Sequence, residues 1–110
     1  MDFNLDVGYR GGISVVKVSG DVDMYTAPIL DACLQRLVVA GKAELAVDLE
    51  DCSYFDSEGV KVLIRALRSA GEPAQLTVCG AQRAVSRVFE VSGLGRIFRI
   101  LASVEDLGST

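Results

Sequence analysis

Ser57 is the residue of this sequence whose type and position most favour chemistry. It stands in the stretch Asp56–Gly59, between the apolar run Ala43–Leu49 and a segment, Val60–Ala70, whose apolar residues recur at helical spacing. A serine in the first turn of a helix can cap that helix, as the neighbouring Asp56 also can. It can also accept a phosphate, because the unpaired backbone N–H groups at a helix N-terminus favour negative charge. From these residues alone, a structural cap and a phosphorylation switch both remain open.

Patterns typical of catalysis or cofactor binding are missing. The sequence holds no histidine, so a Ser-His or Cys-His pair is impossible, and it contains no dinucleotide-binding or phosphate-loop glycine pattern. Seven carboxylates could include an acid–base pair, but we interpret them as turn caps and solvating groups: Asp21, Asp23, Asp48, Glu50, Asp51, Asp56 and Glu58. We therefore predict no catalytic residue, no metal and no cofactor.

Length and composition favour one compact domain that covers residues 1–110, because half of the residues are hydrophobic and 24% are charged. The net charge is -4 and no lysine or arginine cluster forms a basic patch, which argues against nucleic acid. No apolar run reaches the length of a membrane span, and the N-terminus does not resemble a signal peptide. We therefore expect a cytoplasmic protein that binds no membrane.

The three cysteines are widely spaced and form no Cys-x-x-Cys pair. Cys33 and Cys79 lie within apolar patterns and are predicted to be buried thiols. Cys52 lies in a connector and is predicted to be the accessible one. A redox role for any of the three cysteines is the lesser alternative, because no neighbouring residue would lower a thiol pKa.

Strand-like and helix-like segments alternate along the chain. Phe3–Val7 and Ile13–Ser19 read as a hairpin joined by the turn Tyr9–Gly12. The later predicted elements are a helix from Thr26 to Gly41, a strand Leu45–Leu49, a helix through Ala70 with Ser57 in its first turn, a strand Gln75–Cys79, a helix Ala81–Val91, a strand Ile97–Leu101 and a short terminal helix from Ser103. This order predicts an α/β fold with a largely parallel sheet and one antiparallel edge.

The helix that follows Ser57 is amphipathic in this interpretation. Its buried stripe is predicted to consist of Val60, Leu63, Ile64 and Leu67. A basic stripe is expected to face water, made of Lys61, Arg65 and Arg68.

Three stretches resemble motifs of bacterial anti-sigma factor antagonists of the STAS domain family. Gly20–Pro28 is similar to the family's Gly-acidic-aliphatic-Asp stretch, which ends in Ser or Thr, Ala and Pro. Val47–Val60 resembles its phosphorylation segment, in which Asp and Ser precede a small residue and Gly. Phe89–Leu94 resembles its Ser/Thr-Gly-Leu stretch. The motifs occur in family order, and with the predicted elements the resemblance covers essentially the whole chain.

The resemblance implies a STAS-type fold, with a mixed sheet of four to five strands and helices wound as successive βα units. It further implies a non-enzymatic regulator. In the family's best-known branch, the unmodified protein binds an anti-sigma factor that is also a serine kinase, and this releases the sigma factor. ATP-dependent phosphorylation ends the interaction, and a separate serine phosphatase reverses it. Carried over by position, the phosphoacceptor is Ser57, and the docking surface comprises Asp21, Asp23, Asp56, Ser57, Glu58, Gly59, Lys61 and Arg65.

Glu58 departs from the family pattern, which has a small or hydroxyl residue at that position. Its carboxylate could reduce phosphorylation of Ser57, or it could match a basic patch on a particular kinase. It also suits the alternative function, a constitutive scaffold subunit of a transporter or sensory assembly that is never phosphorylated. Binding of a nucleotide or another small ligand is a third possibility, for which this sequence supplies no phosphate loop.

Overall fold

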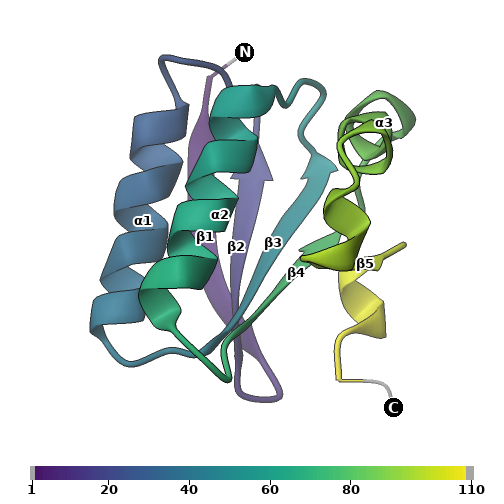
Figure 1. Cartoon of the computed structure of the whole chain (residues 1–110). Helices are drawn as coiled ribbons and strands as arrows, with labels where there is room; N and C mark the ends of the chain where they lie inside the picture. The colour runs from purple at the N-terminus through teal and green to yellow at the C-terminus, as the bar shows by residue number, and fades with distance from the viewer. Residues whose placement is uncertain (1, 109–110) are drawn as a thin grey trace.

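The computed structural model describes residues 2–108 and has a five-stranded sheet at its centre (Figure 1). The strands follow one another across the sheet in sequence order. β1 pairs antiparallel with β2, and every later pair is parallel, which confirms the predicted α/β class and antiparallel edge. The strands are β1 (Asn4–Arg10), β2 (Ile13–Ser19), β3 (Glu44–Asp51), β4 (Gln75–Cys79) and β5 (Arg99–Leu101).

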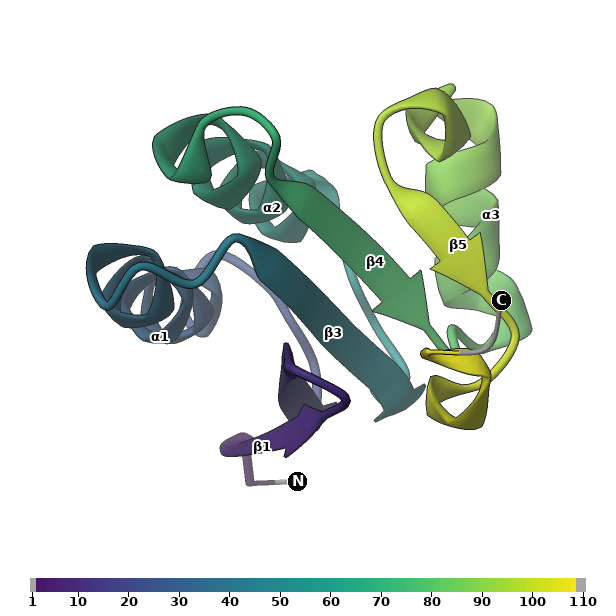
Figure 2. The same cartoon turned by 90° about the horizontal axis from the view of Figure 1, so that it is seen from below.

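Helices connect the parallel strands. α1 (Ala27–Val39) and α2 (Ser57–Ala70) lie side by side over one face of the sheet, and α3 (Arg83–Val91) lies beside β5 (Figures 1 and 2). A 3-10 turn, η1 (Leu94–Arg96), links α3 to β5, and a second, η2 (Val104–Asp106), follows β5. Parallel neighbours need such crossovers, because a tight turn reverses the direction of a strand.

The main core lies between the sheet and the two long helices. Alternate residues of β3 point to opposite faces, so that Leu45, Val47 and Leu49 are buried beneath α1 and α2. Ala46 faces the opposite side of the sheet and belongs to a smaller cluster there, to which the C-terminal segment contributes Leu107. The buried members of this cluster are Ile13, Val15, Ala46, Cys79 and Leu107. The C-terminal segment therefore covers part of the sheet face that carries no long helix.

The buried face of α2 differs from the prediction. Leu63 is fully buried as expected, but Val60, Ile64 and Leu67 are only half-buried. The other buried residues of the helix are Gly59, Val62 and Ala66. Gly59 and Ala66 let the helix approach its neighbours closely, so the buried stripe runs through them with Val62 and Leu63, while Val60, Ile64 and Leu67 flank it. The predicted basic stripe of Lys61, Arg65 and Arg68 is exposed.

Element ends account for the other differences. β1 continues through Tyr9 and Arg10, which were predicted to be in the turn, so the hairpin turn consists of Gly11 and Gly12. β3 is longer than predicted, whereas β5 is limited to Arg99–Leu101. The predicted short terminal helix is a single 3-10 turn, η2, and Ser103 accepts a hydrogen bond from Glu105 N at 3.2 Å as predicted for its cap.

Candidate functional site

Two loops far apart in sequence meet at the N-terminal end of α2. Val22 and Phe55 form an isolated parallel bridge. Val22 N donates to Tyr54 O at 2.8 Å, and Asp56 N donates to Val22 O at 3.3 Å. Asp23 follows Val22 and Asp56 follows Phe55 in the sequence, so these bonds hold Asp23 beside Asp56. They bring together the first two of the three motifs.

Asp56, rather than Ser57, is the cap of α2. Its backbone is extended, and its Oδ1 accepts a hydrogen bond from Glu58 N at 2.9 Å. Ser57 is the first residue of the helix and its side chain is exposed. The sequence left the cap open between these two residues. Because Asp56 takes that role, the Ser57 hydroxyl does not serve as the N-cap.

Asp23 organises the other loop. Its Oδ1 accepts hydrogen bonds from Tyr25 N at 2.8 Å and from Thr26 N at 3.0 Å, just before α1 begins. These backbone donors, Thr26 foremost, lower the pKa of Asp23 below its ordinary value, because they stabilise the charged carboxylate. The hydroxyl of Thr26 donates to Asp21 O at 2.7 Å, which ties the loop together.

A shallow hollow opens between the two loops. Its lining includes Asp23, Asp56, Ser57 and Glu58, so these predicted site residues come together as expected from the motifs. Asp21 does not line the hollow; it precedes Asp23 by two residues, and its Oδ1 accepts a hydrogen bond from Ser53 Oγ at 2.9 Å. The hollow thus presents several carboxylates around one exposed serine hydroxyl.

Sequence reasoning missed the apolar part of this surface. Met24, Tyr25 and Tyr54 also line the hollow, with 64%, 79% and 51% of each residue exposed. Tyr54 OH donates to Asp56 Oδ2 at 3.3 Å, and the negative charge of Asp56 raises the pKa of the phenol. The sequence did hold a signal for these three residues, since all of them lie within the motif stretches and exposed tyrosines are frequent binding anchors.

Two ion pairs lie along the exposed side of α2, and they involve Glu58, Lys61 and Arg65. Lys61 Nζ lies 2.9 Å from Glu58 Oε2, one helical turn away. Arg65 reaches across to α1, where its guanidinium lies 2.8 Å from Asp31 Oδ2. These residues line a second hollow that shares Met24 and Glu58 with the first, so the surface continues along α2.

Gly59 differs from the other predicted site residues because it is buried. The ring of Phe55 lies against its Cα, so this glycine shapes the packing beneath the surface rather than the surface itself.

Two further predictions about side chains were wrong. Cys52 is buried, not accessible, and its Sγ contacts Tyr54 O at 3.1 Å, because the connector folds back under the bridge between Val22 and Phe55. Asp48 is not a solvating carboxylate, because it is only 4% exposed, although its Oδ1 accepts a hydrogen bond from Glu50 N at 3.1 Å as a turn cap would. Burial of Cys79 is confirmed, whereas Cys33 is half-buried.

Within residues 2–108, no three side chains of His, Cys, Asp or Glu are grouped so that they could hold a metal ion. No helix in that range is long and apolar enough to cross a membrane.

The fold and the site together define a domain of successive βα units with an exposed serine at the start of its second helix. The family model for the Mlab, STAS domain matches residues 6–102, and the chain belongs to this family.

Similar proteins support this assignment. The anti-sigma-B factor antagonist of Staphylococcus aureus is 28% identical over 106 residues, covering 96% of this chain and 98% of that protein. The crystal structure of an anti-sigma factor antagonist from Mycobacterium paratuberculosis has a TM-score of 0.88 at 28% identity, covering 96% of this chain and 90% of that one. The fold is also similar to that of the anti-sigma factor antagonist SpoIIAA in its unphosphorylated form, with a TM-score of 0.77 at 22% identity over 96% of this chain and 91% of that chain.

Proposed function

We propose that this protein is an anti-sigma factor antagonist. In this proposal it binds an anti-sigma factor through the hollow around Ser57, and this binding frees a sigma factor. The observation that carries the proposal is the exposed Ser57 in a hollow built by two motif stretches that one backbone bridge joins. The similarity to anti-sigma factor antagonists over 96% of the chain supports it.

The proposed regulation is phosphorylation of Ser57 by an anti-sigma factor that is also a serine kinase, reversed by a serine phosphatase. A phosphate would add about 1.5 to 2 negative charges beside Asp23, Asp56 and Glu58. The N-terminus of α2 tolerates that charge, because the helix dipole and its unpaired N–H groups favour anions. The fold should therefore persist while a partner that matches the unmodified surface is repelled.

The proposed docking surface extends from Asp21 and Asp23 through Asp56, Ser57 and Glu58 to Lys61 and Arg65. It offers carboxylates and exposed apolar side chains next to one another. A partner that presents basic groups around an apolar centre fits this combination. We propose that the protein acts in the cytoplasm and has no catalytic activity of its own.

Glu58 is compatible with this switch because its charge is balanced by Lys61, at 2.9 Å. The pair leaves the hydroxyl of Ser57 exposed, so a kinase active site can reach it. Glu58 is also the residue that favours the second candidate function, a constitutive scaffold that is never phosphorylated. Treatment with a cognate kinase separates the two, since a scaffold would take up no phosphate at Ser57.

The deciding experiment incubates the protein with its cognate kinase and ATP. Mass spectrometry should locate one phosphate on Ser57, and Ser57→Ala should abolish it. Ser53→Ala is a matched control, because Ser53 is also exposed and lies near the same hollow, where it hydrogen-bonds to Asp21. Phosphate on Ser53, or on no residue, would contradict the proposed switch.

A binding measurement tests the consequence of the charge. Ser57→Asp should weaken binding of the anti-sigma factor, whereas its circular dichroism and unfolding midpoint should match the unmodified protein. Ser53→Asp adds the same charge nearby without placing it at the helix start. Equal affinity of Ser57→Asp and the unmodified protein would count against repulsion as the mechanism.

A further inference from the structure

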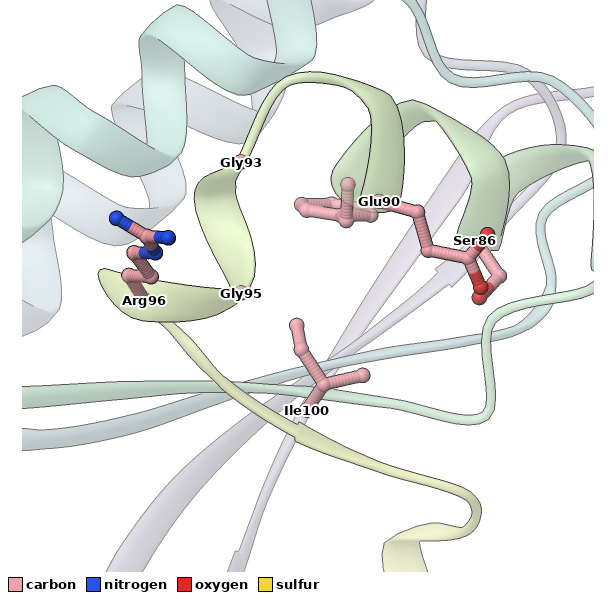
Figure 3. A pocket seen from close by; sticks show the side chains of 7 residues that line it. Ser86, Glu90, Gly93, Gly95, Arg96 and Ile100 are labelled. Carbon is pink, nitrogen blue, oxygen red and sulfur yellow. The ribbon is translucent and has the colours of Figure 1, made fainter.

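A second groove lies between α3, η1 and β5, and it shares no lining residue with the hollow around Ser57. Its volume is about 420 Å³. Figure 3 shows Arg96 at one end of the groove, Ser86 and Glu90 at the other, and Ile100 between them.

The centre of this groove is apolar and open. Ile100 pairs with Val78 in the sheet and therefore lies on the face that carries the helices, yet it remains 40% exposed. Phe89 also lines the groove but is only 2% exposed, so Ile100 supplies the accessible apolar surface over it. Gly93 and Gly95 leave the space unfilled, because a Cβ built on either glycine would meet no atom within 4 Å.

The two ends of the groove carry opposite charges that have no partner in residues 2–108. Neither Arg96 nor Glu90 belongs to an ion pair there, and both residues are exposed. The hydroxyl of Ser86 lies beside the acidic end (Figure 3). An occupant with a negative group at the Arg96 end and a positive group at the Glu90 end would match the charges of the groove. An apolar group between them would be buried at its centre.

We propose that this groove binds a segment of a partner protein in which a bulky apolar side chain stands between an acidic and a basic residue. The apolar side chain packs against Ile100, above the buried ring of Phe89. The carboxylate of the segment pairs with Arg96, and its cation pairs with Glu90 and Ser86. The surface is separate from that of Ser57, so it would serve a second interaction that does not require the anti-sigma factor to leave.

Fluorescence polarisation with labelled synthetic peptides tests this proposal. The probe is a nine-residue peptide with a central phenylalanine, glutamates on one side and lysines on the other. It should bind the full chain, and replacing the phenylalanine by alanine should weaken binding about tenfold, as for loss of an interface anchor. Binding that is indifferent to the phenylalanine would overturn the proposal.

Gly95→Phe is the sharpest variant, because it fills the groove from within. The backbone of Gly95 is outside the left-handed region and its Cβ direction is open, so the fold should accept the ring. Gly8→Phe is the matched control, since Gly8 on β1 has the same freedom and lies away from the groove. Gly95→Phe should lose peptide binding and Gly8→Phe should retain it; equal binding by both variants would place the peptide elsewhere.

Charge reversal supplies a test that a folding defect cannot mimic. Arg96→Glu makes both ends of the groove acidic, so it should lose the mixed probe and gain affinity for a peptide with lysines on both sides. Glu90→Arg should show the opposite preference, for glutamates on both sides. An unchanged preference in these two variants would refute the assignment.

Sedimentation of the unmodified protein completes the test: self-association that Gly95→Phe abolishes would make a second copy the occupant instead.

Discussion

The ring of Phe55 occupies the space that a side chain on Gly59 would need. A Cβ built on Gly59 would lie 2.6 Å from Cζ of Phe55, much closer than real Cβ contacts. Phe55 also packs on Phe89 of α3, with the ring centroids 5.5 Å apart. Because Gly59 has no side chain, Phe55, which forms the bridge with Val22, can lie under the first turn of α2.

Gly59→Ala should destabilise the fold by about 1 to 3 kcal/mol, because the methyl group forces the Phe55 ring or the helix to move. Urea unfolding followed by circular dichroism measures this change. Gly95→Ala serves as the control and should stay within about 0.5 kcal/mol, since its Cβ points into open space. Phe55→Leu should soften the effect of Gly59→Ala; additive losses in the double variant would show that the two residues do not compete for the same space.

Asp56→Ala should lower the free energy of unfolding by about 1 kcal/mol, because Glu58 N loses its capping acceptor. Asp56→Asn keeps an acceptor oxygen and should lose only a fraction of that amount. Denaturant titration of both variants, followed by circular dichroism, checks the order. If the alanine and asparagine variants unfold at the same midpoint, the side chain of Asp56 is not the cap.

Asp23 should contribute to stability at neutral pH and lose that contribution in acid. Its folded-state pKa is lowered from the ordinary value of 3.8 by donors from Thr26 and Tyr25. A depressed carboxylate pKa stabilises the folded state above the unfolded value, and this stabilisation disappears as the pH falls through the folded value. Asp23→Asn should therefore flatten the decline in stability below about pH 4.

Unfolding free energies between pH 2 and pH 6 test the role of Asp23, with Asp6→Asn on the exposed strand β1 as the control. An acid decline as steep in Asp23→Asn as in the unmodified protein would argue against the assigned hydrogen bonds.

The cysteines should differ in their reaction with iodoacetamide in the native state. Burial raises the pKa of all three thiols, that of Cys79 to about 11, so the order should follow how well each thiol is enclosed, and Cys52 and Cys79 are buried. Cys33 is only half-buried and should be alkylated first. Mass spectrometry of peptides from partly labelled protein gives the order, and all three should react at similar rates in denaturant. Early labelling of Cys52 would show that the connector opens readily.

Local patterns in the sequence were sufficient to predict the order of strands and long helices. The β-branched residues of Ile13–Ser19 predicted β2, and the segment Gln75–Cys79 predicted β4, both with their observed bounds, because β-branched side chains suit the extended backbone of a strand. The start of the second helix at Asp56 and Ser57 followed from cap chemistry, which depends on neighbouring residues alone. The three motif stretches also indicated the STAS family, which the family model confirms.

Burial and proximity depended on the tertiary structure. The buried stripe of α2 was misplaced because which side of a helix is covered depends on the neighbouring elements, here α1 and the ring of Phe55. Cys52 was predicted to be accessible because it lies in a connector, yet the chain folds back over it.

Some properties of Ser57 could be predicted from the sequence, and others depend on the tertiary structure. Its residue type, its helix-start position and its family motif can be read from the sequence. Its release from capping depends on the side-chain conformation of Asp56, and its place beside Asp23 depends on a bridge between Val22 and Phe55. Such a bridge joins residues distant in sequence, and its formation is decided by how the whole core packs rather than by either loop alone.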